Sequence, residues 1–148
     1  MWAATFIGIE VKYHEDLRGE ASTHKARYDE IADEMGCFAP DLRERLRSMP
    51  LQQIWRDHLL AGALRHVDGF DDGFFVLLSP KGNGHCADAV SDYRTCLTNE
   101  DSFGKLALED VVAALRRHTD AEWVELFFDR YLAFDKVDAE LAAASRHD

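Results

Sequence analysis

Cysteines and basic residues are scarce in this sequence, and so is any segment that could serve as a leader or an anchor. The cysteines are an odd number without a Cys-x-x-Cys pair, namely Cys37, Cys86 and Cys96. This pattern argues against a disulfide framework and against a structural zinc site. Residues 1–9 are largely apolar, but no basic residue precedes them, and Glu10 and Lys12 follow. We therefore expect neither a signal peptide nor a membrane span, and we expect a cytoplasmic protein.

Positive charge is also in short supply, because 17 Lys and Arg stand against 28 Asp and Glu, for a formal net charge of -11. Such a surface repels a polyanion at long range, so the composition excludes a generally basic nucleic-acid binder. The balance reverses between residues 41 and 65, where arginines outnumber acidic residues. If the protein contacts DNA, we expect a local basic surface formed by Arg43, Arg45, Arg47 and Arg56. A solvated helix face is the alternative.

The length of 148 residues and the apolar content of 47% suit one packed domain. We expect that domain to cover residues 1–137, with a frayed acidic tail over residues 138–148. The helical spacing of apolar residues predicts several helices. The first runs from a cap at Ser22 or Thr23 to Gly36, a short one follows Pro40, and a longer one runs from Pro50 to about Arg65. Three more are predicted over 87–97, 108–115 and 123–134.

Two segments have the pattern of β-strands. Residues 4–13 alternate, so that one face carries Phe6, Gly8, Glu10 and Lys12 and the other, expected to be dry, carries Ile7, Ile9, Val11 and Tyr13. Residues 74–78 form a continuous apolar run, which is typical of a strand buried on both faces. The fold class is therefore α/β, with a small sheet flanked by several α-helices. Because two strands are too few for a stable sheet, we expect further strands from the loops, from another chain or from a missing part of the domain.

Glu10 and Lys12 form the most distinctive pair of polar residues. They lie two residues apart on the predicted strand, so their side chains project from one face about 6.5–7 Å apart along the backbone. A carboxylate in this position can hold Mg²⁺ or Mn²⁺, and a neighbouring lysine can orient water or stabilise charge on a phosphate. The same pair also occurs on exposed strands as an ordinary ion pair, so the spacing alone leaves both interpretations open.

Three segments around this pair carry a family resemblance. Residues 7–13, IGIEVKY, resemble the Glu-x-Lys strand of the PD-(D/E)XK nuclease superfamily. Residues 53–59, QIWRDHL, resemble the helix that follows this strand and often carries a Gln facing the metal, and residues 74–80, FFVLLSP, resemble the next core strand. The resemblance extends more loosely to Val137 and is greatest to a bacterial branch of restriction-endonuclease-like proteins.

This resemblance implies a partial restriction-endonuclease-like core and a metal-dependent DNA endonuclease activity. It also implies Glu10 as a ligand of Mg²⁺ or Mn²⁺, Lys12 as the catalytic lysine and Gln53 as a supporting polar residue. The superfamily places a metal-binding Asp on the strand before the Glu-x-Lys strand, whereas no acidic residue precedes Glu10 here. We therefore expect a truncated or degenerate member that lacks the N-terminal part of the core, with feeble cleavage at most, since one carboxylate holds a metal poorly against water.

Two other functions compete with this hypothesis. One is a non-catalytic interaction protein on a degenerate nuclease scaffold, and the other is a small acidic regulator unrelated to nucleases. Because the strand over 4–13 lacks its usual neighbour, we also expect a homodimer, or a partner chain, at that strand edge. His58 is expected to be a structural histidine, and residues 79–85 are expected to be a connecting turn.

Overall fold

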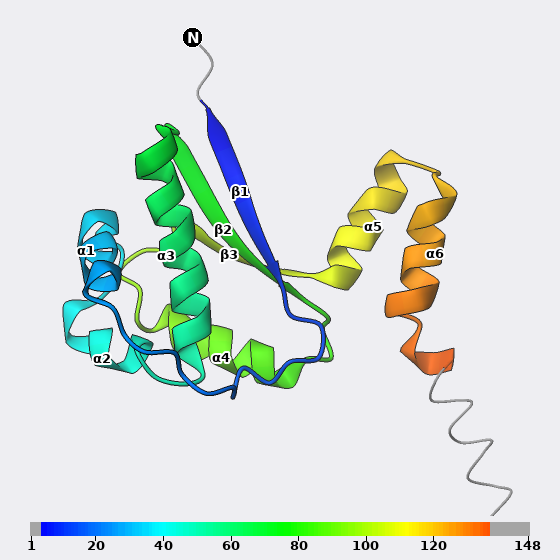
Figure 1. Cartoon of the computed structure of the whole chain (residues 1–148). Helices are drawn as coiled ribbons and strands as arrows, with labels where there is room; N and C mark the ends of the chain where they lie inside the picture. The colour runs from blue at the N-terminus through cyan, green and yellow to red at the C-terminus, as the bar shows by residue number, and fades with distance from the viewer. Residues whose placement is uncertain (1–3, 137–148) are drawn as a thin grey trace, which may run out of the picture. The chain divides into compact units, whose positions relative to one another are not determined.

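The computed structural model describes residues 4–136 as a mixed α/β fold (Figure 1). The elements in chain order are β1 (Thr5–Val11), α1 (Ala26–Met35), the 3-10 helix η1 (Pro40–Leu42), α2 (Arg43–Leu46), α3 (Leu51–Asp68), β2 (Asp72–Ser79), α4 (Gly84–Arg94), β3 (Phe103–Ala107), α5 (Leu108–His118) and α6 (Glu122–Tyr131). A small three-stranded sheet flanked by helices confirms the predicted fold class. The predicted frayed tail, 138–148, lies outside the described residues.

The chain divides into two compact units, Met1–Leu106 and Ala107–Asp148. The first unit contains the sheet and the helices up to α4. In the second, α5 and α6 are joined by a two-pronged ion pair, in which Arg116 Nε and Nη2 lie 2.7 and 2.6 Å from the carboxylate oxygens of Glu125. Among the helices of residues 4–136, none is both long and apolar enough to cross a membrane. The prediction of one domain over 1–137 stays a prediction.

The sheet has the strand order β1-β2-β3. β1 and β2 pair in parallel, from Thr5 opposite Asp72 to Val11 opposite Leu78, which confirms that both predicted strands belong to one sheet. The pairing extends one residue further, because the backbone N–H of Lys12 donates to the carbonyl of Leu78 at 2.8 Å. β3 was not predicted, since it has only five residues and its Gly104 and Lys105 break the apolar pattern.

The two faces of the sheet differ from the prediction. Figure 1 shows α3 lying along one face of the sheet, and the residues beneath it, Phe75 and Leu77, are buried. On the other face, Ile7 is 62% exposed, Ile9 is 60% exposed and Phe74 is 36% exposed. The prediction of a dry face on β1 and of a strand buried on both sides was therefore wrong. An apolar pattern tells where hydrophobic side chains lie, but not which face receives a covering helix.

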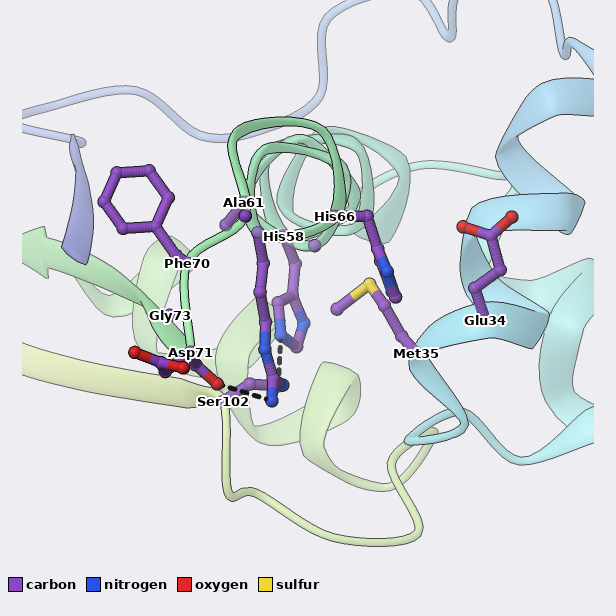
Figure 2. Close-up of a pocket in the computed structure, with 12 residues that line it drawn as sticks. Glu34, Met35, His58, Ala61, His66, Phe70, Asp71, Gly73 and Ser102 are labelled. Carbon is purple, nitrogen blue, oxygen red and sulfur yellow. Dashed lines mark hydrogen bonds between the residues drawn. The ribbon is translucent and has the colours of Figure 1, made fainter. Parts of the chain in front are cut away.

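α3 carries the centre of the core of the first unit. Trp55 and His58 of this helix are almost completely buried. The Nδ1 atom of His58 lies 2.9 Å from the hydroxyl of Tyr93. Its Nε2 atom lies 2.9 Å from the hydroxyl of Ser102, a contact that Figure 2 shows. Burial lowers the pKa of His58 to about 4, so the imidazole is neutral at pH 7. Because both ring nitrogens have partners inside the fold, the structural role expected for His58 agrees with the geometry.

Polar contacts hold the segment after β1 against the start of α3. The side-chain oxygen of Gln52 accepts from the N–H of Ser22 at 2.6 Å, and its amide nitrogen donates to the Ser22 carbonyl at 2.7 Å. Ser22 is thus occupied by Gln52 and does not cap α1, which begins at Ala26 instead. At the other end of α1, Gly36 has φ of 65°, as expected for a glycine that stops a helix.

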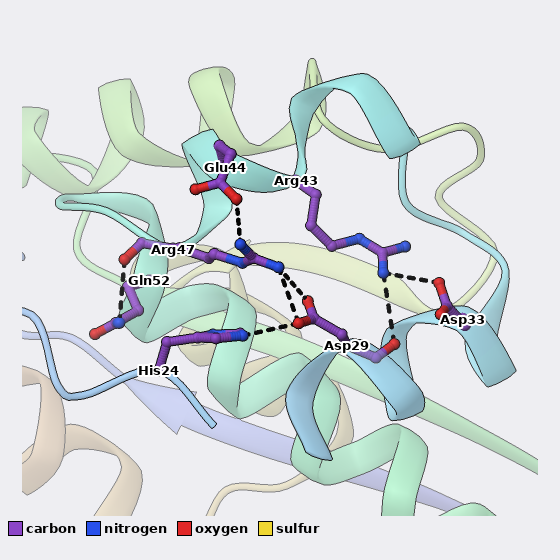
Figure 3. Close-up of polar contacts among 7 residues, drawn as sticks. All are labelled: His24, Asp29, Asp33, Arg43, Glu44, Arg47 and Gln52. Carbon is purple, nitrogen blue, oxygen red and sulfur yellow. Dashed lines mark hydrogen bonds and ion pairs between the residues drawn. The ribbon is translucent and has the colours of Figure 1, made fainter. Parts of the chain in front are cut away.

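A network of charged side chains ties α1 to α2 and its flanking residues (Figure 3). Arg47 donates to both carboxylate oxygens of Asp29 at 2.9 Å, and His24 Nε2 lies 2.8 Å from the same carboxylate. Partial burial opposes the ionisation of Asp29, but these hydrogen bonds outweigh it, and the pKa of Asp29 is lowered. Asp29 therefore remains ionised well below neutral pH and keeps the network intact.

The edge of β1 generates the first testable prediction. β1 is an edge strand among the described residues, and Ile7, Ile9 and Val11 are 62%, 60% and 48% exposed. Burying each side chain contributes roughly 1.5–3 kcal/mol, so we expect a second strand, from another copy or a partner, to pair there. Light scattering at micromolar concentration should show a species heavier than 16.8 kDa. Ile7→Lys should shift it to the monomer, whereas Val67→Lys, at an exposed position of α3, should not. A clean wild-type monomer would contradict the prediction.

The buried histidine generates a prediction about pH. The pKa of His58 is about 4 in the folded protein against 6.5 for an ordinary histidine, so the unfolded chain takes up a proton first as the pH falls. The difference in proton uptake at His58 therefore leaves the free energy of unfolding unaffected above pH 6.5. Between pH 6.5 and pH 4 it lowers the free energy of unfolding, by about 3 kcal/mol in total. His58→Gln should flatten the slope of unfolding free energy against pH over this window, measured by urea denaturation. His66→Gln, which removes an exposed histidine of the same helix, is the control, and an unchanged slope in His58→Gln would refute the assignment.

Candidate functional site

Glu10 and Lys12 meet at the carboxyl end of β1. Their side chains share one face of the strand, as predicted, and the Nζ atom of Lys12 lies 2.5 Å from Oε1 of Glu10. Lys12 is only 5% exposed, whereas the side chain of Glu10 is 38% exposed. The pair therefore consists of a buried ammonium and a carboxylate that solvent can reach. In open α/β sheets, the carboxyl ends of parallel strands are the usual place for a ligand.

Asp57 of α3 brings a second carboxylate to this place. Glu10 and Asp57 line one pocket of about 400 Å³, whose walls are mostly apolar side chains such as Phe6, Leu60 and Leu64. The Oδ2 atom of Asp57 is buried and has no hydrogen-bond partner among residues 4–136. Burial raises the pKa of Asp57, and the negative charge of Glu10 raises it further, while Lys12 and Arg56 act in the opposite direction. Asp57, Glu10 and Lys12 thus influence one another electrostatically.

Gln53 lies one helical turn before Asp57, on the exposed side of α3. It lines a second pocket of about 300 Å³, together with Arg56 and Asp57. Leu17 and Ser22, from the segment after β1, also line it. Gln53 and Glu10 therefore line two different pockets, and Asp57 lines both of them. The role predicted for Gln53 stays a prediction.

The four arginines expected to meet DNA do not form a uniform basic surface. Three of them pair with carboxylates: Arg43 with Asp33 at 2.7 Å, Arg45 with Asp92 at 3.1 Å and Arg47 with Asp29 at 2.9 Å. Arg56 instead donates to the hydroxyl of Ser22 at 2.7 Å and lies over the ring of Tyr28 at 5.9 Å. Arg56 also borders the pocket of Gln53 and Asp57, so its guanidinium is the one of the four placed beside the candidate site.

A larger pocket, of about 520 Å³, lies elsewhere in the first unit (Figure 2). His58 and Ser102 line it, together with Arg65, whose guanidinium donates to the carbonyl of Asp71 at 2.9 Å. Both nitrogens of the neutral His58 ring are already hydrogen-bonded, so the ring of His58 is not available as a base in this pocket. Volume alone does not make it the better candidate.

The segment between β2 and α4 also has a structural role. The side-chain oxygen of Asn83 accepts from the backbone N–H of Cys86 at 2.9 Å and so caps α4. Its side-chain nitrogen donates to the carbonyl of Glu15 at 3.2 Å, which fixes the chain that follows β1. This agrees with the expectation of a connecting turn over residues 79–85.

A family model described as the PD-(D/E)XK nuclease superfamily matches residues 3–133. The chain belongs to this superfamily. Searches of curated proteins and of solved structures found no significant match. This membership excludes the hypothesis of an acidic regulator unrelated to nucleases. PD-(D/E)XK nucleases typically use divalent metals.

Few side chains that could bind a metal lie close together in the described residues. No group of three or more His, Cys, Asp or Glu side chains that could hold a metal occurs within the described residues. Two carboxylates do converge on one pocket, those of Glu10 and Asp57. The sequence analysis gave Asp57 no role, although its spacing from Gln53 and Arg56 puts the three residues on one surface of the helix. The spacing of four residues from Gln53 was the available signal, although it could not show that Glu10 lies opposite.

The buried carboxylate of Asp57 generates a prediction about stability. Asp57→Asn keeps the shape of the side chain and removes a charge that is poorly solvated, so it should raise the free energy of unfolding at pH 7 by on the order of 1 kcal/mol. Because the pKa of Asp57 is raised in the folded protein, the cost of ionisation is present at neutral pH and disappears as the pH falls below the ordinary carboxyl range. The gain should therefore shrink in acid.

Urea denaturation at neutral and acidic pH measures this gain. Asp88→Asn, which changes an exposed aspartate of α4, is the matched control and should leave stability nearly unchanged. A loss of stability in Asp57→Asn at pH 7 would mean that the carboxylate is an ordinary structural group with a satisfied partner.

Proposed function

We propose that this protein is a DNA endonuclease of the PD-(D/E)XK type, which hydrolyses phosphodiester bonds at the Glu10–Lys12 pair with a divalent metal, Mg²⁺ or Mn²⁺. The observation that carries the proposal is the buried ammonium of Lys12, held 2.5 Å from Glu10 at the carboxyl end of β1. A buried charge is costly and is retained where it has a partner or a task. Here the partner, Glu10, is open to solvent and lines a pocket, so the pair is not sealed in the core.

The donors present suit a hard divalent cation. Mg²⁺ and Mn²⁺ bind carboxylate oxygens, and Glu10 offers such an oxygen at the pocket surface. When bound, the ion would supply a nucleophilic water and neutralise charge on the phosphate. Lys12 would donate hydrogen bonds to a phosphate oxygen and stabilise the negative charge that develops there. Gln53 would support the site from the adjoining pocket with its amide group.

DNA must approach this site in spite of the net charge of -11. Arg56 is the best-placed phosphate contact, because it borders the pocket of Asp57 and because its partners are a hydroxyl and an aromatic ring. Arg43, Arg45 and Arg47 would have to exchange their carboxylate partners for phosphate. We therefore propose weak, salt-sensitive binding that is local to the α3 side of the site. Free, buried cysteines at 37, 86 and 96 support the proposal of a cytoplasmic protein.

The alternative is a non-catalytic interaction protein that retains the nuclease scaffold. The exposed apolar side chains of Ile7, Ile9 and Val11 favour it, because soluble monomers seldom keep such residues together on an open strand. This function needs no metal, and it predicts that substitutions at Lys12 leave partner binding intact.

Plasmid cleavage tests the proposed function. Supercoiled DNA incubated with micromolar protein and Mg²⁺ or Mn²⁺ should be nicked slowly, and chelation should stop the reaction. Lys12→Met keeps the apolar stem and removes the ammonium, so it should lower the rate by roughly 100-fold or more, as expected for a group that stabilises transition-state charge. Lys25→Ala, at an exposed lysine before α1, is the matched control.

Circular dichroism on each variant separates loss of activity from loss of fold. Equal nicking by wild type and Lys12→Met would point to a contaminant and contradict the proposal. Absence of nicking by the wild type under all these conditions would favour the interaction protein.

A further inference from the structure

The candidate site contains one more carboxylate than the Glu-x-Lys pair requires. Asp57 comes from α3 and not from a strand, and it reaches the pocket of Glu10 from the side of the helix. Its Oδ2 atom is buried without a hydrogen-bond partner in the described part of the chain. A buried acceptor without a donor is uncommon in a folded protein and requires an explanation, such as an ion that the polypeptide alone does not supply.

The charges around Asp57 point in the same direction. Lys12 is the cation at the centre of the site, and its ammonium is committed to Oε1 of Glu10 at 2.5 Å. Arg56, which directly precedes Asp57 on α3, donates to the hydroxyl of Ser22 at 2.7 Å. Two carboxylates thus line one pocket, and the one lysine that acts on both is paired with Glu10. A divalent cation placed there would supply the missing positive charge and a partner for the unpaired oxygen.

Apart from the two carboxylates, the pocket is lined mostly by apolar side chains. Leu60, Leu64 and Phe75 are among them, and a charge beside apolar side chains is screened less than one surrounded by water. The pocket of Gln53, on the other side of Asp57, leaves room for water or for a phosphate to complete the coordination. The residues that line both pockets all belong to the first unit.

We propose that Asp57 is the second carboxylate ligand of the divalent metal, together with Glu10. Asp57 lies on α3 and replaces the metal-binding Asp that the superfamily carries on a strand. The proposal deepens the proposed function and rests on the same site. It replaces the expectation of a site with one carboxylate by a site with two, contributed by β1 and α3. The competing explanation is structural: Asp57 could exchange with Glu10 as the counter-ion of Lys12 and bind no metal.

A binding experiment distinguishes the role of Asp57 as a metal ligand from its role as a counter-ion of Lys12. Mn²⁺ binding to the full chain is measured by electron paramagnetic resonance in the absence of DNA. Wild type should bind one Mn²⁺, and Asp57→Asn and Glu10→Gln should each weaken binding by roughly 10-fold or more. Lys12→Met should bind Mn²⁺ at least as well as wild type, because it removes a cation and no ligand. Asp88→Asn is the matched control for a carboxylate on a helix outside the site.

Thermal unfolding supplies a second measurement that does not depend on catalysis. A fixed Mn²⁺ concentration near the wild-type dissociation constant should raise the melting temperature of wild type, Lys12→Met and Asp88→Asn, and it should raise that of Asp57→Asn much less, while the fold of this variant is verified without metal. If Asp57→Asn binds Mn²⁺ as tightly as wild type, or if wild type binds none, the proposal is overturned. If Mn²⁺ binding depends on Asp57 but no DNA is cleaved, the metal site stands and the proposed nuclease function fails. If Lys12→Met abolishes cleavage while Asp57→Asn retains wild-type Mn²⁺ binding, the function stands and the role of Asp57 is overturned.

Discussion

The hydrogen bond from the backbone N–H of Lys12 to the carbonyl of Leu78 sets where the pairing of β1 with β2 ends, and the site depends on that position. It carries the parallel ladder one residue beyond Val11, so the backbone of Lys12 still has the conformation of a strand. The alternation of a strand then places Lys12 and Glu10 on the face that α3 covers. A shift of the register by one residue would turn both charges to the opposite face.

α3 has to satisfy two different environments along a single helix. Its buried side supplies Trp55 and His58 to the core, where aromatic contacts and paired ring nitrogens stabilise the first unit. One residue before His58, Asp57 lies at the border between that core and the site. A carboxylate there lowers stability at neutral pH, because burial and the charge of Glu10 both oppose its ionisation. Functional groups are often maintained at such a cost, which the rest of the helix offsets.

The sequence was sufficient for much of the fold but only for part of the site. Proline, glycine and helical spacing predicted α1 and α3 well, and the run over 74–78 predicted β2, because these signals are local. β3 was missed, since its five residues carry no strict alternation. The exposed face of β1 was predicted to be buried, because the position of covering helices depends on contacts between distant segments. Asp57 was not assigned a role for the same reason: its relation to Glu10 spans 47 residues of sequence and exists only in the folded chain.

Electrostatics decides how such a protein could meet a polyanion. A protein with 11 excess negative charges gains nothing from long-range attraction to DNA. Three of the four arginines expected to meet DNA are paired with Asp29, Asp33 and Asp92. Any affinity must therefore arise at short range, where Lys12 and Arg56 both act electrostatically on Asp57. A divalent cation bound beside them would add two positive charges at the point where a phosphate has to sit. Metal binding and DNA binding would then favour each other, since either ligand reduces the repulsion that the other encounters.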